Sequence, residues 1–185
     1  MIWIFLADGF EETEALTTAD ILMRAEQEVL LIHAGNGRIA TGSHGIRVIC
    51  DCQADELDGS ELPGCVVLPG GMPGTLNLEK NPFVQQAIDQ ALANNILLGA
   101  ICAAPSILGH KGVLHGKKAT CFPGFEQELT GAEITGNLVE EDGQIITAKG
   151  MGATVLFGLA LAERLVGKPE ANKIRRSLQM EGEAR

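Results

Sequence analysis

Residues 96–105 have the sequence ILLGAICAAP, in which an apolar run passes directly into a cysteine between small residues. The run at 96–101 has the length and composition of a strand that is buried on both faces of a sheet. Pro105 is typical of the first turn of a helix, and the small neighbours of Cys102 permit a sharp turn. We therefore expect a strand, a tight turn at Cys102 and a helix over 103–109.

Apolar strands and amphipathic helices alternate on both sides of this stretch. Strands are expected at 2–7, 29–33, 46–50 and 65–68, with a hairpin of 138–141 and 144–147 around Asp142-Gly143. Helices are expected at 12–25, 82–93 and 154–165, followed by an amphipathic last helix with the basic residues near 173–176. The alternation predicts an α/β sandwich with a mostly parallel central sheet, folded as one domain over residues 1–185.

The composition excludes several classes of protein. The chain has 185 residues, a formal net charge of -10 and five cysteines. The acidic N-terminal third would repel phosphate, so we expect no nucleic-acid partner. No apolar run is long enough to cross a bilayer, and the first residues lack the basic start of a signal peptide, so no membrane association is expected. An odd number of cysteines without a CxxC pair argues against a disulfide framework and a zinc ribbon and favours a reducing compartment, the cytoplasm.

Cys102 stands where a strand is expected to turn into a helix, which is the geometry of a nucleophile elbow. Free N–H groups at a helix start stabilise a thiolate, so we expect the pKa of Cys102 to be lowered. The alternative is a small buried cysteine that only packs. That alternative is favoured for the other four cysteines, at positions 50, 52, 65 and 121.

Residues 7–14, with the sequence ADGFEETE, place several carboxylates directly after the first expected strand. One interpretation is that they only complement the dipole of the helix that follows. The other is that crowding and burial raise the pKa of one carboxyl, so that it exchanges a proton with a substrate or with Cys102. The spacing alone does not select which acid this is.

Residues 69–74, with the sequence PGGMPG, form a glycine loop after the expected strand 65–68. Glycines let backbone N–H groups approach a ligand, as an oxyanion hole requires. The loop lacks the GK[ST] ending of a phosphate loop, and no complete dinucleotide fingerprint is present, so no cofactor and no metal are expected. Loops 7–14, 69–74 and 100–105 should meet, because ligands collect at the carboxyl ends of parallel strands. No histidine is close enough in the sequence to be an evident base for Cys102.

These three motifs occur in one order, as ADGFEETE at 7–14, LPGG at 68–71 and AICAAP at 100–105, with AKGMGAT at 148–154 near the end. Together they resemble the ThiJ/PfpI superfamily and, within it, the Parkinson-disease-protein (DJ-one) branch. The resemblance covers nearly the whole chain. It implies a flavodoxin-like three-layer sandwich and usually a homodimer.

The resemblance also implies roles for particular residues. Cys102 is the reactive, oxidation-prone nucleophile, and Glu14 is a protonated carboxyl that is hydrogen-bonded to it. Gly71 and Ala103 supply the backbone N–H groups of an oxyanion-hole-like pocket, to which we add Gly70 from the same loop. The implied activity is that of a glutathione-independent glyoxalase on 2-oxoaldehydes such as methylglyoxal, or of the related deglycase on early glycated protein.

Two departures from the family pattern bear on the activity. Protease-like members carry His directly after the nucleophile, whereas this chain has Ala103, so peptidase activity is not expected. Many members of the branch have His where this chain has Phe122, before Pro123, and a pocket donor is lost. Some relatives have Arg where His44 stands. The alternative function is an oxidative-stress chaperone in which Cys102 becomes a sulfinic acid and acts as a redox switch.

Overall fold

The computed structural model describes residues 1–57 and 61–180, so the end of the expected domain at 181–185 lies outside this part. In the described ranges, one sheet of seven strands has the order β10-β11-β7-β6-β1-β2-β5, and only β10 runs antiparallel to its neighbour. Its strands are β1 (Ile2–Leu6), β2 (Val29–His33), β5 (Cys52–Gln53), β6 (Cys65–Leu68), β7 (Leu97–Ile101), β10 (Val139–Asp142) and β11 (Ile145–Ala148). The expected mostly parallel sheet is confirmed, including the β10–β11 hairpin.

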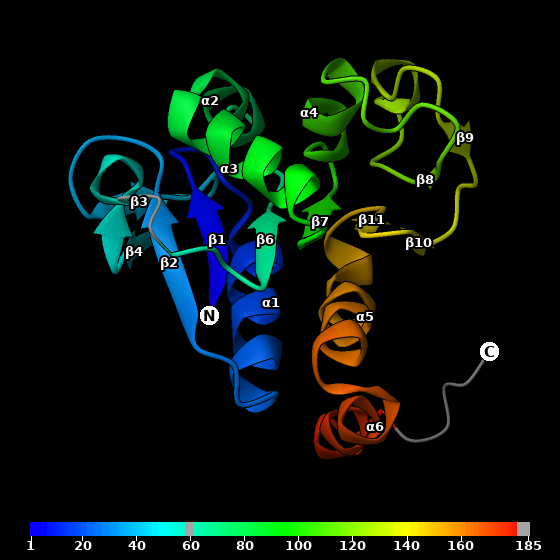
Figure 1. Ribbon diagram of the computed structural model, residues 1–185. Coiled ribbons are helices and arrows are strands. Elements are labelled where there is room, and N and C mark those ends of the chain that lie inside the picture. Colours follow the sequence, from blue (N-terminus) through cyan, green and yellow to red (C-terminus); the bar gives the residue numbers. More distant parts are fainter. Residues whose placement is uncertain (58–60, 181–185) are drawn as a thin grey trace.

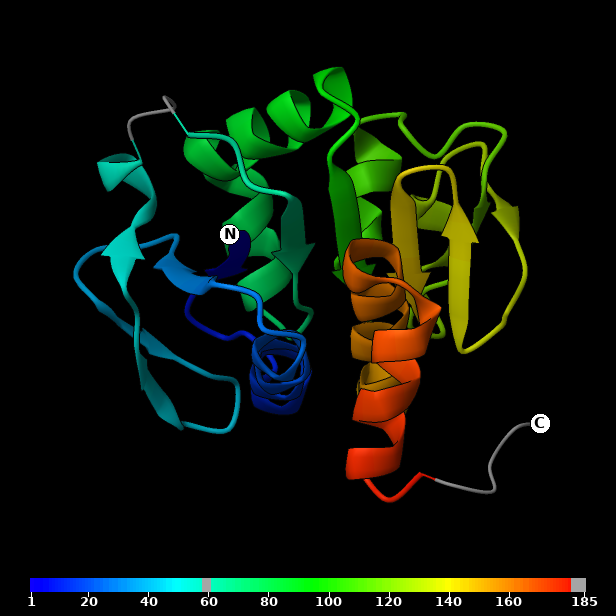
Figure 2. The same cartoon turned by 60° about the horizontal axis from the view of Figure 1, so that its bottom comes forward.

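Helices cover both faces of the sheet. On one face lie α1 (Glu12–Arg24) and α5 (Thr154–Val166), with α6 (Lys168–Ser177) packed on α5 (Figures 1 and 2). On the other face lie α2 (Gly74–Lys80), α3 (Pro82–Ala93) and α4 (Pro105–His110). Each face buries its own apolar cluster. The three-layer α/β sandwich is therefore confirmed.

The central strands are buried on both faces, which explains their continuous apolar sequences. All residues of β1, β6 and β7 are buried. Strand β1 pairs in parallel with β2 on one side and with β6 on the other, and β6 pairs in parallel with β7. The carboxyl ends of these strands therefore lie side by side along one end of the sheet. The arrowheads of β1, β2 and β6 point towards that end in Figure 1.

Several short elements were not expected or differ from expectation. The strand predicted at 46–50 is β4 (Arg47–Ile49), and it pairs with β3 (Ile39–Thr41) in a separate hairpin instead of joining the central sheet. Arg47 and Ile49 are exposed, which suits a surface hairpin. Helix α2 was also missed, because it starts at Gly74 inside a Pro- and Gly-rich segment. The described elements also include two short strands, β8 (Lys118–Ala119) and β9 (Glu133–Ile134). Three 3-10 turns complete them, namely η1 (Ala54–Glu56), η2 (Glu126–Glu128) and η3 (Met151–Ala153).

Within residues 1–57 and 61–180, no helix has the length and apolar character that crossing a bilayer requires.

Two glycines allow close packing of α1 and α5 and of α5 against β7. A Cβ on Gly158 of α5 would lie 2.8 Å from Ile21 Cδ1, so the absence of a side chain lets α1 and α5 approach each other. A Cβ on Gly99 of β7 would lie 2.8 Å from Phe157 Cζ, so the ring of Phe157 packs directly under the strand. Phe157 is fully buried. This ring supports β7, the strand that Cys102 directly follows.

We expect Phe157→Ala to lower the free energy of unfolding by about 3–5 kcal/mol, because it leaves a cavity under β7. Leu156→Ala is the matched control, since Leu156 is the half-buried neighbour on the same helix, and it should cost about 1 kcal/mol or less. Urea unfolding of the two variants beside the wild type measures both values. Equal losses would contradict the packing described here.

Candidate active site

The three loops expected to meet do meet, at the carboxyl ends of β1, β6 and β7. Glu11 N–H donates to Gly70 O at 2.8 Å, which joins the loop after β1 to the loop after β6. Gly70 also lies against Cys102, because a Cβ on Gly70 would be 2.6 Å from Cys102 Cβ. Glycine at position 70 is therefore required for the loop after β6 to reach the loop after β7.

Cys102 occupies a strained turn. Its φ is +65°, a left-handed conformation that residues other than glycine adopt at a cost. Two backbone hydrogen bonds hold it there: Cys102 N–H donates to Ala148 O at 2.9 Å, and Phe122 N–H donates to Cys102 O at 2.8 Å. The helix does not begin at once, as we expected, because a turn at 102–104 precedes α4. The nucleophile-elbow geometry is nevertheless present.

Two of the three predicted backbone donors face the sulfur. The N–H groups of Ala103 and Gly71 hydrogen-bond to the Cys102 side chain. The third has a different position, because Gly70 N–H donates to Glu14 Oε2 at 2.9 Å. Gly70 therefore holds the carboxyl of Glu14 instead of pointing at the sulfur. Gly71 adopts a φ of +92°, and a Cβ there would collide with backbone atoms of Gly9, Phe10 and Glu11.

Glu14 is fully buried beside the thiol. Its Oε1 has no hydrogen-bond partner of standard geometry among the described residues, and its Oε2 accepts from Gly70. Burial raises the pKa of Glu14 to about 7, against the opposing effects of the Gly70 N–H and of a hydrogen bond with Cys102. This is the protonatable carboxyl that the acidic motif predicted without identifying it.

The pKa of Cys102 is raised, contrary to our expectation from the helix start. Burial is the largest cause, and the negative charge and hydrogen bond of Glu14 add to it, so that the pKa reaches about 12. The N–H groups of Ala103 and Gly71 only partly oppose this rise. Two neighbouring groups that both resist ionisation titrate as a pair. The Cys102–Glu14 pair therefore keeps at least one proton at neutral pH.

The neighbouring acids Glu11 and Glu12 have other roles. Glu11 Oε2 accepts from Glu14 N–H at 2.6 Å and caps α1. Glu12 is buried and accepts from His44 N–H at 2.7 Å and His44 Nδ1 at 2.9 Å, and from Ser43 Oγ at 3.2 Å. Burial alone would raise the pKa of Glu12, but these hydrogen bonds outweigh it and lower the pKa to about 2. Glu12 thus ties α1 to the β3–β4 hairpin as a permanent carboxylate.

One group of side chains in the described ranges has the spacing of a metal site. Ligand atoms of Glu11, Glu12 and His44 all lie within 4.8 Å of one another. The carboxylates of Glu11 and Glu12 are already used as acceptors, one for the helix cap and the other for His44. We therefore assign these residues to the local structure of the loop.

The rim of the site contains Phe122 and Gly150. A Cβ on Gly150 would lie 3.2 Å from Phe122 Cδ2 and 3.9 Å from Cys102 Sγ, so the ring and the sulfur border the same space. Phe122 is about half exposed. The sequence identified Phe122 only as a departure from a family pattern, and it gave no reason to place Gly150 here.

The remaining cysteines are all free, and Cys50, Cys65 and Cys121 are buried while Cys52 is half-buried. Burial raises the pKa of each of them. This agrees with the packing role expected for these four positions.

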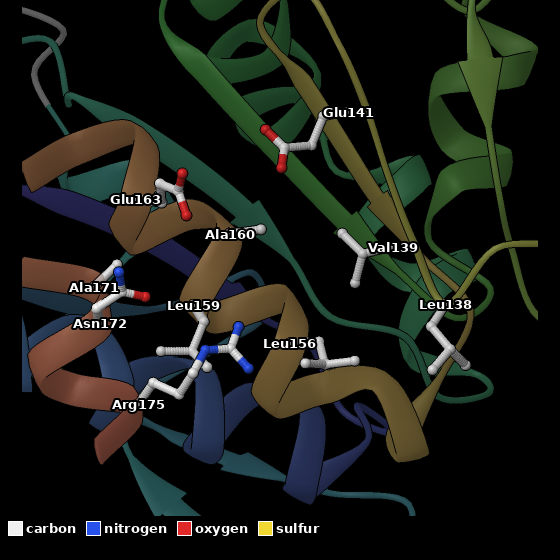
Figure 3. Close-up of a pocket in the computed structure, with 10 residues that line it drawn as sticks. All are labelled: Leu138, Val139, Glu141, Leu156, Leu159, Ala160, Glu163, Ala171, Asn172 and Arg175. Carbon is white, nitrogen blue, oxygen red and sulfur yellow. The ribbon is translucent and has the colours of Figure 1, made fainter. Parts of the chain in front are cut away.

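A cavity of about 440 Å³ lies away from these groups, between β10, α5 and α6 (Figure 3). Leu138, Val139 and Leu156 line one end, and the carboxylates of Glu141 and Glu163 lie towards the other. Neither Cys102 nor Glu14 borders it.

Comparisons with known proteins agree on one family. The model of the DJ-1/PfpI family matches residues 1–164. The chain is 30% identical to Protein dj-1beta of Drosophila melanogaster over 177 residues, which are 95% of this chain and 94% of that protein. It is 33% identical over 181 residues to Protein DJ-1 homolog B of Arabidopsis thaliana, covering 97% of this chain but only 41% of that protein, so it spans less than half the length of this relative. A Caenorhabditis elegans relative, 27% identical over 91% of this chain and 89% of its own, is named a glutathione-independent glyoxalase.

Solved structures show the same similarity. A DJ-1 superfamily protein of Salmonella typhimurium has a TM-score of 0.91 at 31% identity, covering 96% of this chain and 97% of its own. The oxidized DJ-1 of Toxoplasma gondii has a TM-score of 0.92 at 29% identity, with the same coverage of both chains.

We expect stability to fall as the pH rises through the titration of Glu14. The unfolded carboxyl ionises near 4.5 and the buried one near 7. Between these values the folded state holds a proton that the unfolded state has released, so the free energy of unfolding decreases with rising pH, by at most about 3 kcal/mol.

Glu14→Gln should remove this dependence, because an amide does not titrate. Urea unfolding at about pH 4.5 and about pH 7.5 measures it, and Glu28→Gln, which replaces an exposed acid, is the control that should retain it. The same pH dependence in wild type and Glu14→Gln would refute the assignment.

Proposed function

The chain belongs to the DJ-1/PfpI family, and on that premise we propose that it is a glutathione-independent glyoxalase or protein deglycase that acts on 2-oxoaldehydes such as methylglyoxal. The observation that carries the proposal is the Cys102 thiol beside the fully buried Glu14, with the N–H groups of Gly71 and Ala103 directed at the sulfur. The name of the Caenorhabditis elegans relative supports the same reaction.

In the first step, Cys102 acts as the nucleophile and its sulfur adds to the aldehyde carbon. A carbon–sulfur bond forms, and the carbonyl oxygen takes the proton that Cys102 and Glu14 share, which gives a hemithioacetal. The N–H groups of Gly71 and Ala103 stabilise the negative charge that develops as the bond forms. A pair that keeps one proton at neutral pH suits this step, because it holds both the nucleophile and the acid.

In the second step, Glu14 acts as a base. Its carboxylate removes the hydrogen from the former aldehyde carbon as a proton and returns a proton to the adjacent carbon, while the hydroxyl proton passes to the second oxygen. The product is the thioester of a 2-hydroxy acid. Water hydrolyses the thioester, releases the 2-hydroxy acid (lactate from methylglyoxal) and restores the thiol. A pKa near 7 lets Glu14 both accept and donate a proton.

The same chemistry applies to an early adduct of a glyoxal on a protein, so a glycated protein is the alternative substrate. The chain has Ala103 where protease-like members of the superfamily have His, and we therefore do not propose a peptidase. The five free cysteines suit a reducing compartment, and we place the protein in the cytoplasm.

We also propose a homodimer, as in the proteins that the sequence resembles. Helix α1 and the neighbouring β3–β4 hairpin expose large apolar side chains that a partner would cover, namely Leu16, Met23, Ile39, Ile46 and Ile49. The Glu12 side chain joins the start of the helix to the loop of the hairpin through Ser43 and His44, which fixes the two elements to each other at that point.

A second candidate function is an oxidation-sensing chaperone with Cys102 as the switch. Cys102 is half-buried, and the Gly71 and Ala103 N–H groups, with the protonated form of Glu14, would stabilise the oxygens of a sulfinate. The similar Toxoplasma gondii structure is named as an oxidized form.

We expect Cys102→Ser and Glu14→Gln each to lower lactate formation from methylglyoxal at least about 100-fold, since each removes a group that takes part in bond making or proton transfer. Cys52→Ser, at a half-buried cysteine in the edge strand β5, is the control and should retain activity. The measurement is enzymatic lactate detection without glutathione. A wild type that forms no lactate rules out the proposed reaction.

For the second function, mild peroxide should add the mass of two oxygen atoms at Cys102, as detected by mass spectrometry of peptides. Protection of a client protein from aggregation should appear with that modification and be lost in Cys102→Ser. Protection that is equal before and after oxidation would exclude the redox switch.

A further inference from the structure

His110 is the last residue of α4 and lies between two carboxylates. Its Nδ1 is 2.5 Å from Glu79 Oε1 on α2, and its Nε2 is 2.7 Å from Glu128 Oε2 in η2. An ionised carboxylate only accepts hydrogen bonds, so both ring nitrogens must carry a hydrogen to satisfy both contacts. The geometry therefore describes an imidazolium that bridges three segments of the chain.

Each bridged segment is connected to the candidate active site. Helix α4 follows the Cys102 turn, and α2 follows the loop of Gly70 and Gly71. The turn η2 lies in the segment 122–129, whose first residue, Phe122, is at the rim of the site. Phe122 N–H donates to Cys102 O, and its ring borders the space in front of the sulfur. His110 does not touch the thiol, but it joins the elements that surround it.

A second contact packs the segment 122–129 against α4. A Cβ on Gly109 would collide with Glu128 O and Leu129 Cα, so the backbone at 128–129 lies directly on the helix beside His110. Leu129 is buried against the apolar cluster of that face. The Glu128 carboxylate is thus brought to His110 by packing that does not depend on charge.

We propose that His110 is a positioning residue which, as an imidazolium bridging Glu79 and Glu128, holds the segment 122–129 over Cys102 and sets access to the thiol. The inference rests on the proposed function only in taking Cys102 as the reacting group.

The charges around His110 fix the direction of its pH dependence. Glu128 and Glu79 are the charged groups that face it, and the adjacent Lys111 is engaged by Asp89 and Gln85 of α3. Hydrogen bonds from Glu128 and Glu79 raise the pKa of His110 above its ordinary value of 6.5. The bridge is therefore complete below that ordinary value and is lost as the pH rises through the raised pKa.

Hydrogen exchange of the amides at 125–129 tests the proposal without using turnover. At about pH 6, His110→Gln and Glu128→Gln should each exchange about fivefold faster than the wild type, a modest factor because the groups are partly exposed. At about pH 9 the difference from the wild type should disappear, because the wild-type ring is then neutral. His115→Gln is the matched control: His115 is exposed and has no carboxylate at ion-pair distance among the described residues.

Two further measurements make the result decisive. Nitrogen NMR of the wild-type protein should show that both nitrogens of His110 stay protonated above pH 6.5, the ordinary pKa of a histidine side chain. Alkylation of Cys102 by iodoacetamide should be faster in His110→Gln than in the wild type at about pH 6, and equal in the two at about pH 9. A His110 ring that loses its proton at or below pH 6.5, or exchange rates that are the same in His110→Gln and His115→Gln, would overturn the proposal. If the wild type makes no lactate but these differences are found, the proposed reaction fails and the positioning role remains.

Discussion

The hydrogen bond from Gly70 N–H to Glu14 Oε2 connects the parts of this molecule that matter most for its chemistry. It holds a carboxyl in a fully buried position, which would be costly without a donor. It also requires the start of α1 and the loop after β6 to lie in contact, and the loop after β7 joins them where Cys102 packs against Gly70. Glycine at 70 and 71 permits that contact, because a side chain at either position would collide with a neighbouring loop. The parallel sheet brings these loops to one edge, and the small residues let them touch.

The loop after β1 shows how one short acidic sequence yields three different carboxylates. Glu11 caps α1, and Glu12 is kept ionised by donors from the β3–β4 hairpin. Burial raises the pKa of Glu14 to about 7. The negative charge of Glu11 makes a smaller contribution to the raised pKa of Glu14. The hairpin, which does not belong to the central sheet, thereby supports the site without forming part of it: it keeps Glu12 ionised and the start of α1 in place.

The sequence predicted the sheet, most helices and the meeting of the three loops, because strand burial and turn-forming residues are local properties. It also predicted Cys102 at a sharp turn, whereas the left-handed backbone at Cys102 was found only in the structure. It did not predict the raised pKa of Cys102, since the helix start is visible in the sequence whereas the neighbouring Glu14 and the burial come from the fold. For the same reason Gly70 was grouped with the donors to the sulfur, although its N–H is used by Glu14. The short strands β5, β8 and β9 have too few residues to show a periodic pattern.

The raised pKa values of Cys102 and Glu14 change the explanation of reactivity at this turn. A thiolate stabilised by backbone N–H groups alone would be reactive at all times, towards aldehydes and peroxides alike. Here the sulfur becomes a strong nucleophile only when its proton moves to Glu14 or onto an incoming oxygen, because the pair retains one proton at neutral pH. An aldehyde accepts that proton on its own oxygen as the carbon–sulfur bond forms. In the proposed reaction, the buried acid therefore favours the step that consumes the shared proton, and the segment 122–129 controls which molecules reach the thiol.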